Sequence, residues 1–140
     1  MSYSLSFSKA VFVVVFISDK IRQEQYEYLS TKMISEMLNI PKPTLVKILQ
    51  SLTNKGIVET KEGKAGGIRL AKKPSKIKIL DVFNAIEEGK QLFHTSFDIA
   101  KGKRPDKAQK LLTNLFNKAE DQMKSTLAEK TIEQLLVEMD

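Results

Sequence analysis

Apolar side chains recur along most of this chain at the three- and four-residue spacing of amphipathic helices. The first such segment, residues 6–22, has a wide stripe of Phe and Val, and its β-branched run would also suit a strand. Its length and its serine-rich start favour a helix that is buried on most sides. The same spacing predicts helices over residues 31–38, 43–54 and 79–88.

The residues between the second and third predicted helices indicate a sharp turn. Ser30 or Thr31 can cap helix 31–38, whose apolar side is expected to comprise Met33, Ile34, Met37 and Leu38. Asn39 tolerates a left-handed conformation, and Pro41 cannot continue a helix. Pro43 suits the first turn of helix 43–54, which has a buried stripe of Leu45, Ile48, Leu49 and Leu52.

A β-hairpin is predicted directly after this pair of helices. Gly56 can end the helix in a left-handed conformation, and residues 57–61 and 68–71 read as two strands. The three glycines of residues 62–67 allow positive φ angles at the hairpin tip. Two short helices followed by such a hairpin are typical of a winged helix-turn-helix, which places its second helix in the DNA major groove.

A long amphipathic helix is predicted over residues 105–127, followed by a shorter one over 131–139. Such a long helix often forms a dimer seam. The residues predicted to dimerise are Leu111, Leu112, Leu115, Phe116, Ala119 and Met123. The predicted fold is mainly α with a small hairpin wing, divided into a DNA-binding domain (1–90), a connecting loop (91–104) and a dimerisation helix with a C-terminal helix (105–140).

The charge is concentrated in the middle of the chain. The formal net charge is +6, and residues 42–78 hold ten basic and two acidic side chains. After residue 104 acidic side chains outnumber basic ones. This distribution suggests a polyanion-binding face, although a merely lysine-rich solvated surface is the alternative.

The sequence holds no set of residues that supports catalysis. It has no Cys, which excludes disulfides, thiolate metal sites and thiol catalysis, and His94 is its only His. Glu87 and Glu88 are interpreted as an exposed helix end rather than as a catalytic carboxylate pair. The apolar run 12–17 is too short to span a bilayer. We therefore expect a cytoplasmic protein that is not an enzyme and has no cofactor.

Four segments taken together resemble the Rrf-two family of bacterial winged-helix regulators, namely residues 40–49, 55–58, 63–70 and 79–87. The family includes an iron–sulfur regulator, a nitric-oxide sensor and a cysteine-metabolism repressor. The resemblance implies a homodimer on a dyad-symmetric operator, with the long helix crossing to the partner and the wing probing the minor groove. It implies DNA contacts at Lys42, Thr44, Lys47, Lys61, Lys64, Gly66, Gly67 and Arg69.

Three departures from the family pattern change these expectations. Cluster-binding members have three Cys between the helix at 79–88 and the long helix, and residues 88–106 have none, so we predict no iron–sulfur cluster. The wing position where Arg is common is Glu62, which is unsuited to the negative minor groove. The acidic residue by which some members read a base is Val46, so the operator should differ from theirs.

Two functions of different classes follow from the sequence. The first is a cluster-free, dimeric transcriptional regulator, expected to be a repressor. The second is a winged helix used for protein contact, with the basic face meeting an acidic partner. A regulatory ligand could bind under Phe93 and Phe97, or a partner enzyme could supply the signal, and the simpler interpretation is that these two rings pin the loop.

Overall fold

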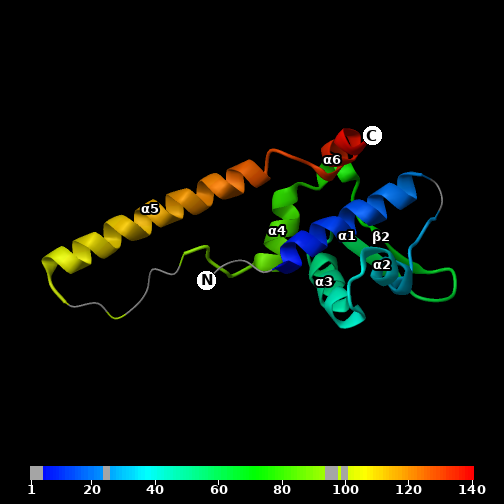
Figure 1. Cartoon of the computed structure of the whole chain (residues 1–140), viewed down its shortest axis with the longest axis horizontal. Coiled ribbons are helices and arrows are strands. Elements are labelled where there is room, and N and C mark those ends of the chain that lie inside the picture. Colours follow the sequence, from blue (N-terminus) through cyan, green and yellow to red (C-terminus); the bar gives the residue numbers. More distant parts are fainter. Residues whose placement is uncertain (1–4, 24–25, 94–97, 99–100) are drawn as a thin grey trace.

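The computed structural model describes residues 5–23, 26–93, 98 and 101–140. Helix α1 lies in the middle of the body, with α2, α3 and the hairpin on one side and α6 on the other (Figure 1). The elements are α1 (Leu5–Arg22), α2 (Thr31–Leu38), α3 (Lys42–Asn54), β1 (Val58–Lys61), β2 (Gly67–Leu70), the short 3-10 helix η1 (Pro74–Lys76), α4 (Ile79–Glu87), α5 (Lys103–Leu127) and α6 (Ile132–Met139).

Residues 6–22 are helical, which confirms the prediction of a helix rather than a strand for this segment. Ala10, Val13, Val14 and Ile17 of α1 are buried in the central core. Phe12 belongs to the same apolar run but is largely exposed, and it lines a surface pocket together with Leu38 and Leu135.

The turn between α2 and α3 forms as its residues predict. Ser30 caps α2 by accepting a hydrogen bond from the backbone N–H of Met33 at 3.0 Å. Asn39 adopts a left-handed conformation with φ of 52°. The prediction that Met37 faces inward is wrong, because its side chain is 62% exposed. Only Ile34 is fully buried on this short helix.

The four predicted leucine and isoleucine positions of α3 are all buried. Pro43 stands in the first turn of α3, and Gly56 follows the helix with φ of +71°. Because one side of α3 is fixed in the core, its opposite side faces solvent.

The hairpin is antiparallel, with Val58 opposite Leu70 and Lys61 opposite Gly67. Strand β1 begins one residue later than predicted, and β2 begins and ends one residue earlier than predicted. The backbone of Leu29 pairs with Ile68 through two hydrogen bonds, Leu29 N–H to Ile68 O at 2.9 Å and Ile68 N–H to Leu29 O at 2.7 Å. These bonds anchor the hairpin to the body.

The prediction that Glu87 and Glu88 form an exposed helix end is wrong for Glu87. Glu87 is only 2% exposed, and Lys90 Nζ lies 3.1 Å from Glu87 Oε2. The reason is that α4 packs against α1, α3 and α5, so its last turn is enclosed. Glu88 is exposed and pairs with Lys55 at 2.7 Å.

Helix α5 has 25 residues, a length of about 37 Å; it contacts α4 and projects from there away from the body (Figure 1). The chain then returns, and Ile132 and Leu136 of α6 enter the central core. The sequence grouped α6 with the long helix, whereas in the structure α6 packs on α1 and η1. In the part of the chain that the structure describes, no helix is long and apolar enough to cross a membrane.

Candidate nucleic-acid interface

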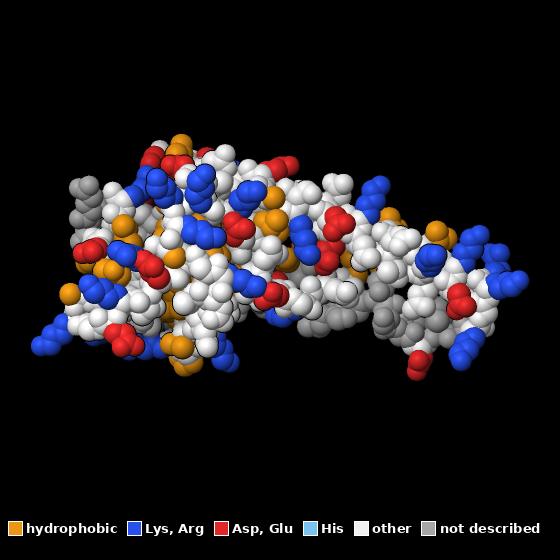
Figure 2. All heavy atoms as spheres, turned by 180° about the vertical axis from the view of Figure 1, so that it is seen from behind, with side chains coloured by type: hydrophobic (Ala, Val, Ile, Leu, Met, Phe, Trp, Pro, Cys, Tyr) orange, Lys and Arg blue, Asp and Glu red, His pale blue; other side chains and the backbone are white. Residues whose placement is uncertain are grey.

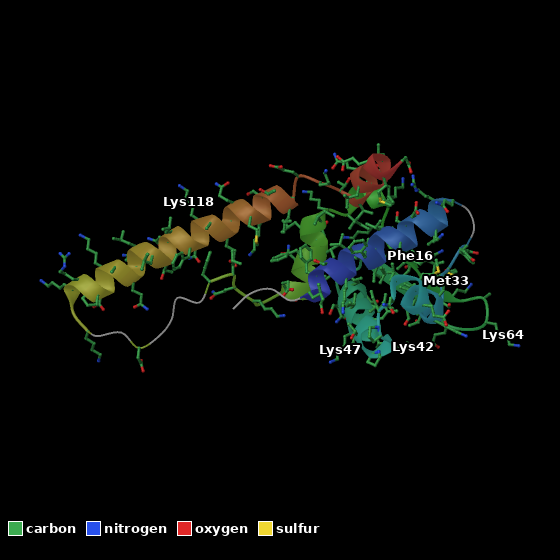
Figure 3. The ribbon with its side chains drawn as sticks, viewed as in Figure 1. Phe16, Met33, Lys42, Lys47, Lys64 and Lys118 are labelled. Carbon is green, nitrogen blue, oxygen red and sulfur yellow. The ribbon has the colours of Figure 1, made fainter. Side chains whose placement is uncertain are left out.

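The outer side of α3 presents polar and basic side chains. Lys42 and Lys47 are exposed and project away from the body, on the side of α1 opposite to α6 (Figure 3). Thr44 is half-buried at the edge of the same helix. The leucines on the inner side of α3 hold this surface rigidly.

The hairpin supplies a second set of lysines. Lys61 and Lys64 are exposed, and Lys64 stands at the tip of the loop (Figure 3). Lys61 Nζ lies 5.5 Å from the centre of the Tyr28 ring, which lies at the base of the wing. Glu62, next to Lys61, is also exposed. Between the two lysines the wing therefore carries one acidic side chain.

Arg69 was predicted to contact DNA, and in the structure this partly exposed residue pairs with glutamates at the base of the wing. Its Nε donates to Glu59 Oε1 at 2.6 Å, and its Nη1 lies 4.0 Å from Glu27 Oε1. Its guanidinium also lies 4.7 Å from the centre of the Tyr28 ring. The hydrogen bond that Arg69 donates to Glu59 raises the pKa of Arg69 above its ordinary value. Much of its charge is thus compensated within the wing.

Gly66 and Gly67 have a clear structural role. A Cβ at Gly66 would collide with the backbone carbonyl of Lys61. Gly67 has φ of +145°, and a Cβ there would lie 2.5 Å from the carbonyl oxygen of Leu29. Gly66 allows close backbone packing within the hairpin, and Gly67 allows the hairpin to pack against the segment before α2.

A basic cluster at the start of α5 was not recognised in the sequence analysis. Its five exposed members are Lys101, Lys103, Arg104, Lys107 and Lys110. They gather at the end of α5 that lies furthest from the body (right side of Figure 2). The signal was present in the sequence, since half of residues 101–110 are basic. Three of the five lie before residue 105, outside both segments whose charges were counted.

The predicted ligand position lies only partly within the described structure. Phe93 stacks on Phe116 of α5 with ring centres 4.7 Å apart, and the Leu92 N–H donates to Glu120 Oε1 at 2.6 Å. These contacts favour the interpretation that Phe93 pins its segment to α5. His94 and Phe97 lie outside the described residues.

A pocket of about 720 Å³ lies elsewhere, at the base of the wing, between the end of α1, strand β2 and α6. Its lining includes Glu59 and Arg69 of the hairpin and Leu136 of α6. Its volume is in the range of small-molecule pockets. This pocket is distant in sequence from the predicted ligand position.

Two helices with lysines on the outer side of the second, next to a lysine-bearing hairpin, define a winged helix-turn-helix of the DNA-binding type. Residues 4–138 match the family model of Rrf2, described as an iron-dependent transcriptional regulator. The chain therefore belongs to the Rrf2 family of transcriptional regulators.

Individual relatives agree with this assignment. The HTH-type transcriptional regulator NsrR of Shouchella clausii is 34% identical over 70 residues, which is 50% of this chain and 47% of that protein. The HTH-type transcriptional regulator IscR of Cereibacter sphaeroides is 29% identical over 90 residues, which is 64% of this chain and 58% of that protein. The chain thus spans about half the length of these curated relatives.

A solved structure extends the likeness in fold to the whole chain. CymR, the global cysteine regulator of B. subtilis, superposes with a TM-score of 0.71 and covers 100% of this chain and 99% of its own. Sequence identity in this comparison is 21%, so it supports the fold alone.

The family description implies iron, and the side chains of this protein do not fit an iron–sulfur cluster. Such clusters are held by Cys thiolates, and the sequence has no Cys and a single His. Within the described residues, no group of three or more His, Cys, Asp or Glu side chains could hold a metal ion. No step of the function is therefore assigned to a cluster.

Proposed function

We propose that this protein is a homodimeric, cluster-free transcriptional repressor that binds a dyad-symmetric operator in double-stranded DNA. The observation that supports this most strongly is the two-sided character of α3. Lys42 and Lys47 lie on its exposed side, and its buried side is entirely apolar. A helix fixed in this way can enter the major groove without rearrangement.

Electrostatic attraction supplies most of the proposed affinity. The lysines of α3 and of the hairpin would neutralise phosphates and release condensed counterions, so binding should weaken steeply with salt. Lys61 and Lys64 are the wing residues best placed for this, because Arg69 is already paired with Glu59. Polar residues near the start of α3 would read base edges.

The dimer is proposed to form through the apolar side of α5. Leu111, Leu112 and Leu115 are 61%, 49% and 57% exposed. None of residues 103–127, all of which the structure describes, is fully buried. Burying one leucine side chain contributes about 1.5–3 kcal/mol, so this helix gains considerably from a second copy. Two protomers related by a two-fold axis would then present two α3 helices to successive turns of DNA.

Repression is the simplest consequence of such binding, because a dimer seated on a promoter excludes other proteins from the same DNA. This part of the proposal is tested by transcription in vitro from a template that contains an operator selected from random DNA. We expect the purified protein to reduce transcript yield from that template and to leave a template without the operator unchanged. Increased yield would indicate an activator instead.

A second candidate is a winged helix that binds an acidic protein partner. The acidic Glu62 in the wing and the internal pairing of Arg69 favour it, since both reduce the positive charge available to DNA. A gel-shift assay at low salt with the protein's own promoter region separates the two candidates. Absence of any retardation would favour the protein partner.

The proposal as a whole is tested by selecting bound sequences from random DNA with the purified full-length protein. We expect enrichment of two inverted half-sites on one face of the duplex, about 10 bp or a multiple of that apart. Failure to enrich any sequence, with a folded protein at low salt, would refute sequence-specific binding.

A further inference from the structure

Val46 is an exposed apolar residue on the side of α3 that is proposed to face DNA. Its side chain is 53% exposed, although the buried stripe of α3 takes up every leucine and isoleucine of this helix. Lys42 lies one turn before it and Gln50 one turn after it, and both are exposed. Val46 therefore interrupts an otherwise polar surface.

A valine at this position contributes little to the stability of the folded protomer. Valine is a weaker helix former than Lys, Gln or Glu, and a half-exposed side chain recovers only part of its burial energy. The stability of the protomer thus gives no strong reason for an apolar side chain here. A contact formed only in the complex would supply one.

The major groove offers one apolar feature among its hydrogen-bonding groups, the C5-methyl group of thymine. Valine has no polar side-chain atom, so it cannot pair with the donors and acceptors of the other base edges. Val46 is the fifth residue of α3, in the N-terminal part of the helix, and this part of a recognition helix contacts bases.

We infer that Val46 selects thymine at one position of each operator half-site by packing against its C5-methyl group. This inference rests on the proposed function, since it requires α3 to lie in the major groove. Lys42 and Lys47 fix the position of the helix by binding phosphates, and Val46 between them supplies the base preference.

The test replaces each thymine of one selected half-site by deoxyuridine, one at a time. This change removes the methyl group and keeps the O4 acceptor and the base pair. For the unmodified protein, we expect one replacement to weaken binding about fourfold, the effect of losing one buried methyl-sized group. Fluorescence anisotropy with labelled duplexes at fixed salt measures the affinities.

Two variants make the result specific. Val46→Ala should bind the thymine and deoxyuridine duplexes equally at that position, because its side chain no longer reaches the methyl group. Val137→Ala is the matched control, since Val137 is 66% exposed on α6, away from α3, and this variant should keep the fourfold difference. Thermal unfolding confirms that both variants are folded.

Several outcomes would overturn the inference. Half-sites without thymine, no sensitivity of the unmodified protein to any replacement, or a fourfold difference that persists in Val46→Ala would each show that Val46 does not read a methyl group. All three leave DNA binding itself intact. Loss of binding to every duplex would instead refute the proposed function.

Discussion

Arg69 shows how the partners of a side chain decide its role. Its position in the wing predicts a contact with DNA, but Glu59, Glu27 and the Tyr28 ring surround its guanidinium. An arginine already paired within the protein gains less from a phosphate, because the internal pair must first be broken. Lys64 stands at the exposed tip of the hairpin loop, so its position leaves it available to a phosphate.

Arg69→Gln should therefore change mainly the stability of the protein, and Lys64→Gln mainly its DNA binding. Arg69→Gln is expected to lower the midpoint of thermal unfolding slightly, by about 2 °C, and to leave the salt dependence of DNA binding almost unchanged. Lys64→Gln should keep the unfolding midpoint and reduce the slope of log K against log salt by roughly 0.9. If Arg69→Gln reduced the slope by a full phosphate contact, the internal pairing of Arg69 would not govern its role.

Gly67 gives a second prediction for a single residue. Gly67→Ala should destabilise the protein by about 2 kcal/mol or more, because it places a Cβ against the Leu29 carbonyl at a φ angle that favours glycine. Gly63→Ala is the control, since Gly63 also has positive φ but has open space around its Cβ position. Urea unfolding measures both, and equal losses would show that the contact with Leu29 is unimportant.

At the scale of elements, the sequence predicts most helices because their starts, ends and apolar stripes are local. The α2–α3 turn follows from Ser30, Asn39 and Pro43 without reference to the remaining chain. The exposure of Met37 and the burial of Glu87 could not be predicted in this way. They depend on which distant element packs against each helix, and no local pattern specifies that.

The apolar side of α5 leads to a prediction at this scale. Replacing Leu112 and Leu115 together by Glu should raise the dimer dissociation constant roughly a thousandfold or more, because four leucines are lost from a two-fold interface. The fold should survive, since both side chains are exposed in the protomer. Sedimentation equilibrium measures the dissociation constant.

Lys110→Glu is the matched control for this experiment. Lys110 lies on the polar side of α5, so the reversal of its charge should leave the dimer intact. A double leucine variant that remains dimeric would show that the interface lies elsewhere.

For the whole molecule, the structure adds a closure between distant segments. Arg22 at the end of α1 donates two hydrogen bonds to the carboxylate of Asp140 after α6, at 2.8 and 2.7 Å. Together with Ile132 and Leu136 in the core, this pair fixes α6 to the body. The predicted division of the chain placed α6 with α5 because both follow the connecting loop. The spacing of apolar residues within a helix does not indicate that the chain returns to the core.

This closure has a pH dependence of defined sign. The hydrogen bonds from Arg22 lower the pKa of Asp140 below its ordinary value. The pair therefore stabilises the fold above the unfolded-state pKa of about 4, and this contribution disappears as the pH falls through the lower folded-state value. Asp140→Asn should show a smaller loss of thermal stability than the unmodified protein between about pH 5 and pH 2. Parallel curves for the two proteins would show that the pair does not contribute.

Whether the exposed side of α3 binds DNA can be read from the salt dependence of affinity. Fluorescence anisotropy with a selected operator should show that Lys42→Ala with Lys47→Ala reduces the slope of log K against log salt by roughly two contacts per protomer. The variant Lys110→Ala with Lys118→Ala removes the same charge from α5 (Figure 3) and should keep the original slope. An unchanged slope in the α3 variant, with DNA affinity intact, would contradict the account.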